Sequence, residues 1–170
     1  MAGTKPNTRH IVPGIVVQLP AEGGGACGLV THTAPESRGM IVFFFPPPLP
    51  TGASDGGVGT VQLGKRKPAD AIEVVFCADQ GIRLRRWTIV GTESGFDQSQ
   101  WPIPLFRYDD ALRGTVYAEA LDPESLFPSQ RWPVLPEDVP PRSSGMNGYL
   151  LAEDMVLEAL RAKGLVRRRI

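Results

Sequence analysis

The chain has 170 residues, of which 42% are hydrophobic and 21% are charged, and this composition suits one globular domain and excludes a disordered chain. Its 18 basic and 18 acidic residues cancel, which excludes a global charge that would attract nucleic acid or an anionic membrane. The 17 prolines and 19 glycines predict a fold rich in loops.

The first residues, MAGTKPNTRHIVPG, contain no apolar stretch of signal-peptide length. Nowhere does the chain reach the roughly 18 consecutive apolar residues of a membrane helix. Cys27 and Cys77 fit no close-spaced metal or redox motif. We therefore expect one cytoplasmic domain over residues 1–170, with reduced thiols and with neither a metal ion nor a cofactor.

Short segments rich in β-branched and aromatic residues, bounded by turn residues, occupy the first half of the chain. Their hairpin-like spacing predicts a mainly β protein of the α+β class, built on a curved antiparallel sheet or a small open barrel. Between the third and fourth segments, residues 46–60 (PPPLPTGASDGGVGT) predict a flexible loop. The five predicted strands are residues 10–19, 26–33, 40–45, 71–78 and 86–91.

Residues 98–110 read QSQWPIPLFRYDD and form a proline-shaped segment. Pro102 and Pro104 each fix φ and remove a backbone donor, which excludes a regular helix or a central strand. We predict an extended segment that Trp101 and Phe106 fasten to the sheet. Trp87, in a predicted strand, is expected in the core, whereas Trp101 fits either a core anchor or an interface hot spot.

Residues 107–138 carry seven acidic and three basic residues, a net charge of −4. With few periodic apolar positions, this segment is predicted to lie over the surface of the sheet. An acidic face with exposed aromatic residues can steer and hold a basic protein partner, and the alternative is a solvated face without a partner. The residues predicted to bind a partner are Trp101, Arg107, Asp109, Asp110, Asp122 and Glu124.

Residues 148–163 (GYLLAEDMVLEALRAK) predict the one convincing helix, which packs on the sheet. Asp154, Glu158 and Arg161 form a polar stripe with Glu153 beside it, and Gly164 stands where a left-handed cap would end the helix. A short helical turn is also predicted at residues 122–126, with Asp122 as its cap.

Catalytic motifs are missing. His10 and His32 are the only histidines, and a Cys27–His32 dyad on one strand would need a bulge to bring both side chains to one face. Adjacent acids such as Asp109 and Asp110 have no partner in the sequence that would raise a pKa, so we expect no enzyme. The basic runs at residues 65–67 and 83–86 are better explained as solvated turn charge than as a nucleic-acid site.

Seven short motifs occur along the chain in the order found in one bacterial family. Over about residues 10–163 they resemble immunity protein 26 of polymorphic toxin systems. The closest is W-P-x-P-x-F, met by Trp101, Pro102, Pro104 and Phe106. The others are PGIVVQLP at 13–20, GACGLVTH at 25–32, MIVFFF at 40–45, WTIVG at 87–91, LPED at 135–138 and GMNGY at 145–149.

This resemblance implies a stoichiometric inhibitor that binds a cognate toxin domain, such as a nuclease, and needs no catalytic residue. In that case Trp87, Pro102, Pro104 and Phe106 are structural. The alternative from another class is a small-molecule-binding or weakly enzymatic β-barrel with a pocket at its mouth, in which Cys27, His32 and Cys77 would be the reactive residues. The sequence leaves the oligomeric state open.

Overall fold

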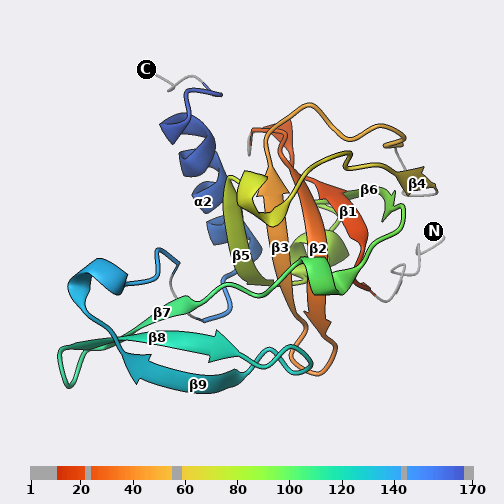
Figure 1. Ribbon diagram of the computed structural model, residues 1–170. Helices are drawn as coiled ribbons and strands as arrows, with labels where there is room; N and C mark the ends of the chain where they lie inside the picture. Colours follow the sequence, from red (N-terminus) through yellow and green to blue (C-terminus); the bar gives the residue numbers. More distant parts are fainter. Residues whose placement is uncertain (1–10, 22–23, 55–58, 143–144, 167–170) are drawn as a thin grey trace, which may run out of the picture.

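The computed structural model describes residues 11–21, 24–54, 59–142 and 145–166 (Figure 1). These residues form two β-sheets and a C-terminal helix, so the predicted mainly β architecture is confirmed. Both sheets are open and do not close into a barrel. Within the described residues, no helix has both the length and the apolar character needed to cross a bilayer.

The larger sheet has six strands in the order β4-β6-β1-β2-β3-β5. All neighbours are antiparallel except β4 and β6, which are parallel. Five of these strands were predicted, with boundaries that differ by a few residues, and the short β4 was not. The strands are β1 (Ile15–Gln18), β2 (Cys27–Ala34), β3 (Gly39–Phe45), β4 (Thr60–Val61), β5 (Glu73–Ala78) and β6 (Thr88–Glu93).

The loop predicted at residues 46–60 has backbone contacts where the structure describes it. Thr51 forms a bridge with Gln62, and the amide of Ser54 donates to the carbonyl of Val90 at 3.0 Å. Residues 55–58 lie outside the described residues. The described part of the loop is therefore irregular, as predicted, and the hydrogen bond from Ser54 attaches it to β6.

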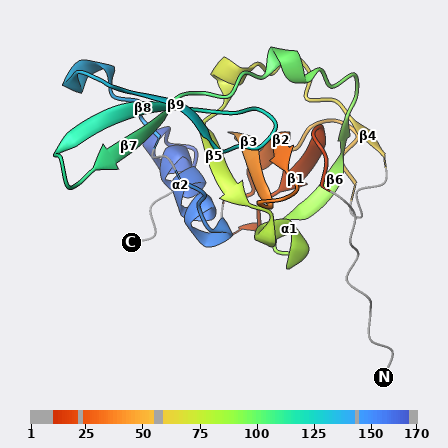
Figure 2. The same cartoon turned by 90° about the horizontal axis from the view of Figure 1, so that it is seen from below.

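A second sheet is formed by β7 (Phe106–Asp110), β8 (Thr115–Leu121) and β9 (Pro128–Pro133), in that order. It projects beside β5 on the edge of the larger sheet (Figures 1 and 2). The prediction that residues 107–138 lie over the surface of the larger sheet missed that they form a sheet of their own, although Leu121 and Leu126 do pack against the larger sheet. These residues pair with one another because two turns, at 111–114 and 122–127, reverse the chain.

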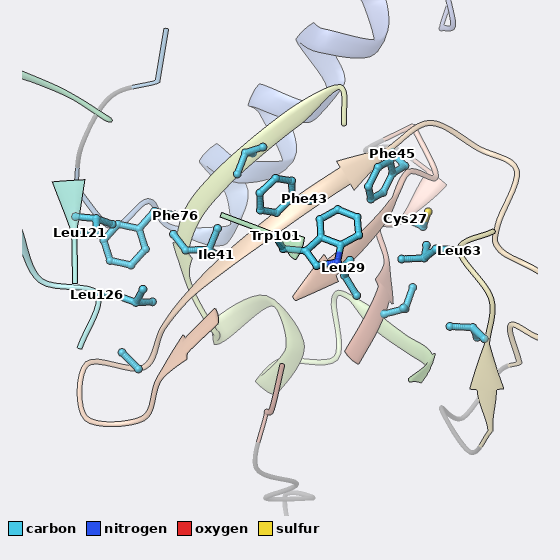
Figure 3. Packing of buried hydrophobic residues seen from close by; sticks show 14 of the residues in the cluster. Cys27, Leu29, Ile41, Phe43, Phe45, Leu63, Phe76, Trp101, Leu121 and Leu126 are labelled. Atoms are coloured by element: carbon cyan, nitrogen blue, oxygen red, sulfur yellow. The ribbon is translucent and has the colours of Figure 1, made fainter. Parts of the chain in front are cut away.

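Both faces of the larger sheet are buried, because β3 carries apolar side chains at consecutive positions and successive side chains point to opposite faces. On one face, Phe43 and Phe45 pack with Trp101 (Figure 3). On the other face, Phe44 packs with Trp87 and the C-terminal helix. The first core also reaches the second sheet through Phe106, Leu121 and Leu126.

Helix α2 (Tyr149–Ala162) lies between its N-cap Gly148 and its C-cap Lys163, close to the predicted bounds. Ala152, Val156 and Leu160 face the sheet and are fully buried. Glu153 was predicted beside the polar stripe of this helix. It is instead buried, and its side chain faces the residues that follow helix α1 (Gln80–Arg83). Its carboxylate accepts hydrogen bonds from Arg86 and from Nε1 of Trp87, the latter at 2.8 Å.

Arg142 and Asn147 contact the outer edge of β5. The amide of Ala78 donates to the carbonyl of Asn147, and the backbone and side-chain amides of Asn147 donate to the carbonyl of Phe76. Arg142 forms an ion pair with Glu73 at 3.3 Å, and its carbonyl accepts from the amide of Arg107 at the start of β7. Arg142 therefore contacts both β5 and β7 and joins the edges of the two sheets.

Candidate protein-binding surface

Residues 122–127 (DPESLF) form a tight loop that connects β8 to β9. Oδ1 of Asp122 accepts from the amides of Glu124 and Ser125 and from the Ser125 hydroxyl, at 2.8 to 3.1 Å. These hydrogen bonds lower the pKa of Asp122 and keep its carboxylate charged. The amide of Leu126 donates to the carbonyl of Asp122. The predicted helical turn is confirmed as a single i→i+4 turn that does not continue into a helix, and Asp122 caps it.

Three hollows meet at this turn. One of about 620 Å³ includes His32, Trp101 and Glu124 in its wall. A second, of about 430 Å³, lies between the turn and residues 34–36 of the β2–β3 connection. A third, of about 380 Å³, lies between the two sheets and is bordered by Phe127. The turn is thus a ridge with a depression on each side, a shape that suits contact with another molecule.

Unpaired negative charge gathers on this ridge. Glu36, Asp122 and Glu124 line one hollow and form no ion pair within the described part of the chain. The side chain of Phe127 stands beside them and is 58% exposed. We refer to these four residues, Glu36, Asp122, Glu124 and Phe127, as the turn surface. It combines charge with an exposed aromatic ring, as protein-binding sites often do.

The other predicted acids lie elsewhere and are neutralised. Asp109 pairs with Arg107 at 2.8 Å on β7. Asp110 accepts from the amides of Leu112 and Arg113 and so holds the β7–β8 turn. Because Asp110 pairs with the first residue of β8 and Asp122 follows the last, the two lie roughly 20 Å apart along the strand. The predicted acidic face is therefore not continuous.

Trp101 is a core residue in this structure and not part of an exposed surface. It is 7% exposed, and its ring meets Phe43 and Phe45 edge-on at centroid distances of 5.3 and 6.0 Å. We therefore remove it from the predicted partner-binding residues. Its neighbours Pro102 and Pro104 continue from the short 3-10 helix η3 (Gln98–Gln100) to β7 as an irregular extended segment.

The residues that were predicted to be structural lie in or next to the core. Trp87 and Phe106 are each 1% exposed, on opposite faces of the larger sheet. Pro104 is half-buried and Pro102 is exposed. The side chains of Trp87 and Phe106 thus anchor their segments of the chain in the core.

The alternative site of Cys27, His32 and Cys77 is not assembled. A bulge at Thr31 interrupts the β2–β3 register, as a dyad would require, but Cys27 lies opposite Phe45 and His32 opposite Ile41. These partners are four residues apart on β3, so Cys27 and His32 lie about 13 Å apart along the sheet. Cys77 belongs to the core on the opposite face. Burial also lowers the pKa of His32.

Both thiols should be unreactive in the folded protein. Cys27 and Cys77 are free and buried, and burial raises both pKa values, although Arg66 partly opposes the shift at Cys27. We expect a disulfide reagent to label neither cysteine at pH 8 within minutes and to label both after unfolding in urea. Fast labelling of either thiol in the native protein would restore the alternative of a reactive cysteine.

Three arginines of the basic runs, Arg66, Arg83 and Arg86, have contacts within the fold. Arg66 donates to the carbonyl of Pro48 at 2.9 Å and lies over the ring of Phe45. Arg83 pairs with Asp79, and Arg86 pairs with the buried Glu153. The guanidinium groups of these three arginines are therefore engaged within the fold, whereas Lys65, Lys67 and Arg85 are exposed. In the described residues, no three histidine, cysteine or acidic side chains are grouped as a metal site.

No family model matches the chain, and no curated protein or solved structure shows significant similarity to it. The geometry of the turn surface is therefore the main guide to its role. Sequence reasoning found Asp122 and Glu124 but missed Glu36 and Phe127. Glu36 is 86 residues before Asp122, and only the tertiary fold brings the two together.

Proposed function

We propose that the protein acts by binding another protein through the turn surface, as an immunity protein that neutralises a bacterial toxin domain in the cytoplasm. The observation that carries this proposal is the gathering of Glu36, Asp122 and Glu124, without ion-pair partners in the described chain, around the exposed ring of Phe127. Charge at the rim guides association, and an aromatic side chain near the centre supplies apolar contact.

The charge of the turn surface suits a basic partner. A toxin that cleaves nucleic acid has a positive surface where it binds phosphate groups. An inhibitor that places three carboxylates against such a surface would compete with the nucleic acid for it. The resemblance of residues 10–163 to an immunity protein family supports the same class of partner.

The direct test is calorimetric titration against the toxin-type domain encoded by the adjacent gene, inactivated if it is lethal. We expect one-to-one association with a Kd in the nanomolar range or below, about −12 kcal/mol or stronger. A folded domain that shows no heat and no change in sedimentation on mixing would contradict the proposal.

The second test reverses charge on the turn surface. The double substitution Glu36→Lys and Glu124→Lys should weaken binding at least tenfold, mainly through slower association, and should reduce the dependence of the association rate on salt. Surface plasmon resonance at several ionic strengths measures both effects. Asp122 is left unchanged because its carboxylate holds the turn.

The matched control is Glu137→Lys with Asp138→Lys, which makes the same change of charge in the exposed 3-10 helix η4 (Pro136–Asp138). Both double variants should unfold at nearly the wild-type temperature. Equal losses of affinity in the two variants would mean that only net charge matters and that the turn surface is not the interface.

A further inference from the structure

The hollow of about 380 Å³ between the two sheets differs in character from the turn surface. Its wall is mostly apolar and includes Phe76 from β5, Leu121 and Leu126 around the end of β8, and Met146. Phe76, Leu121 and Leu126 gather where the two sheets meet (Figure 3). We call this hollow the inter-sheet cleft.

A neutralised ion pair lies in the wall of the inter-sheet cleft. Glu119 is 2% exposed, and its Oε2 accepts from Nε of Arg131 at 2.8 Å and also from Nη2. The guanidinium carbon of Arg131 lies 3.6 Å from the centroid of the Tyr108 ring. Hydrogen bonding to Glu119 raises the pKa of Arg131. The pair has no net charge, so the cleft favours a neutral occupant.

The second carboxylate oxygen of Glu119 is available. Both hydrogen bonds from Arg131 use Oε2, and no bond to Oε1 occurs within the described chain. In the described residues, the fully buried side-chain atoms without a hydrogen-bond partner are Oδ1 of Asp79, Nε of Arg142 and Nε of Arg161, and Oε1 of Glu119 is not among them. The unbonded Oε1 of Glu119 is therefore not sealed off, and since Glu119 lines the cleft, this acceptor is reached from it.

We propose that the inter-sheet cleft binds a small neutral aromatic molecule that carries one N–H or O–H donor. The donor bonds to Oε1 of Glu119, and the ring packs among Phe76, Leu126 and Met146. The volume falls within the range of about 300–1,000 Å³ typical of ligand sites, but it is too small for a helix of about 10 Å diameter. A mostly apolar wall with a few polar groups, here Ser37, Tyr108 and the Glu119–Arg131 pair, is the usual design of such a site. This binding site goes beyond the proposed function and does not depend on it.

Indole is a suitable probe because it is a flat, neutral ring system with one N–H donor. Titration of the ¹⁵N-labelled full chain with indole should give saturable shifts of amide signals at Leu121, Leu126 and Met146. Indene has nearly the same shape without the donor and should bind about tenfold more weakly, because Oε1 would lose its contact with solvent and gain no partner.

The position of the binding site is tested by a substitution at the edge of the inter-sheet cleft that blocks it with a larger side chain. Met146 is 46% exposed, so Met146→Trp can place a larger ring over the cleft without disturbing the core, whereas removal of Glu119 would leave Arg131 unpaired. We expect Met146→Trp to abolish the indole shifts. Leu150→Trp, an exposed apolar position on α2, is the control and should leave them unchanged.

Three results would overturn the proposal. One is the absence of saturable shifts with indole at millimolar concentration. Another is persistence of the shifts in Met146→Trp, which would place binding elsewhere. The third is equal affinity for indole and indene, which would mean that Glu119 does not recognise the donor. None of these results bears on association with a protein partner through the turn surface.

Discussion

Replacement of Glu153 by alanine should lower the free energy of unfolding by about 3 kcal/mol. Glu153 is buried, and one carboxylate accepts from two nitrogens of Arg86 and from Nε1 of Trp87. Without it, the indole N–H of Trp87 has no partner in a core position that water does not reach. The loss should appear as a lower urea midpoint with an unchanged slope.

The neighbouring substitution Asp154→Ala is the control, because Asp154 is exposed on the same helix and should change stability by no more than about 0.5 kcal/mol. Glu153→Gln should fall between the two, since its amide oxygen can still accept from Trp87 while the charge that pairs with Arg86 is lost. If Glu153→Ala unfolds at the wild-type urea concentration, the buried network does not stabilise the fold.

Replacement of Trp101 by alanine should destabilise the protein by about 3–5 kcal/mol, the usual cost of removing a buried tryptophan. The ring fills space over Phe43 and Phe45, and no other aromatic side chain of residues 98–105 can replace it. Because Trp101 also fastens the segment that leads to β7, local opening of the second sheet should increase. Hydrogen exchange of the β7 and β8 amides measures this effect.

Trp132→Ala is the matched control, since Trp132 lies on β9 with 38% of its surface exposed. It should cost about 1 kcal/mol or less in the free energy of unfolding. Similar losses for both tryptophans would contradict the assignment of Trp101 to the core. Loss of partner binding in Trp101→Ala without loss of stability would instead return Trp101 to the interface.

Local patterns in the sequence were sufficient for the larger sheet and for α2. Within β3, residues 41–45 (IVFFF) are β-branched or aromatic at consecutive positions, and their preference for strands does not depend on distant contacts. The helix has both a periodic pattern and a glycine that ends it, at Gly164 with φ of +69°. For these elements, local preference and tertiary structure agree.

The second sheet could not be predicted in the same way. β9 is exposed along its whole length and has proline at both ends, so it lacks the apolar alternation that marks a strand. Pairing with β8 makes it a strand, and that pairing depends on the turn that Asp122 caps. The burial of Glu153 was likewise hidden, because its partners Arg86 and Trp87 are more than 60 residues away.

The candidate site was only partly visible in the sequence. Asp122 and Glu124 were found by counting charge, but the same count gave equal weight to Asp109 and Asp110, which pair with arginines or hold a turn. Which acids keep an unpaired charge depends on side-chain contacts that a sequence does not contain. The approach of Glu36 to this cluster follows from the way the β2–β3 connection meets the β8–β9 turn.

The pairing of Asn147 with the outer edge of β5 has a consequence for folding during synthesis on the ribosome. All strands of the larger sheet are synthesised before Asn147. A nascent chain can therefore assemble that sheet while the carbonyl of Phe76 and the amide of Ala78 still lack their hydrogen bonds to Asn147. An open strand edge recruits other chains. The interval between completion of β6 and emergence of Asn147 is therefore when a newly made molecule is most vulnerable to aggregation, and when a chaperone would protect it most.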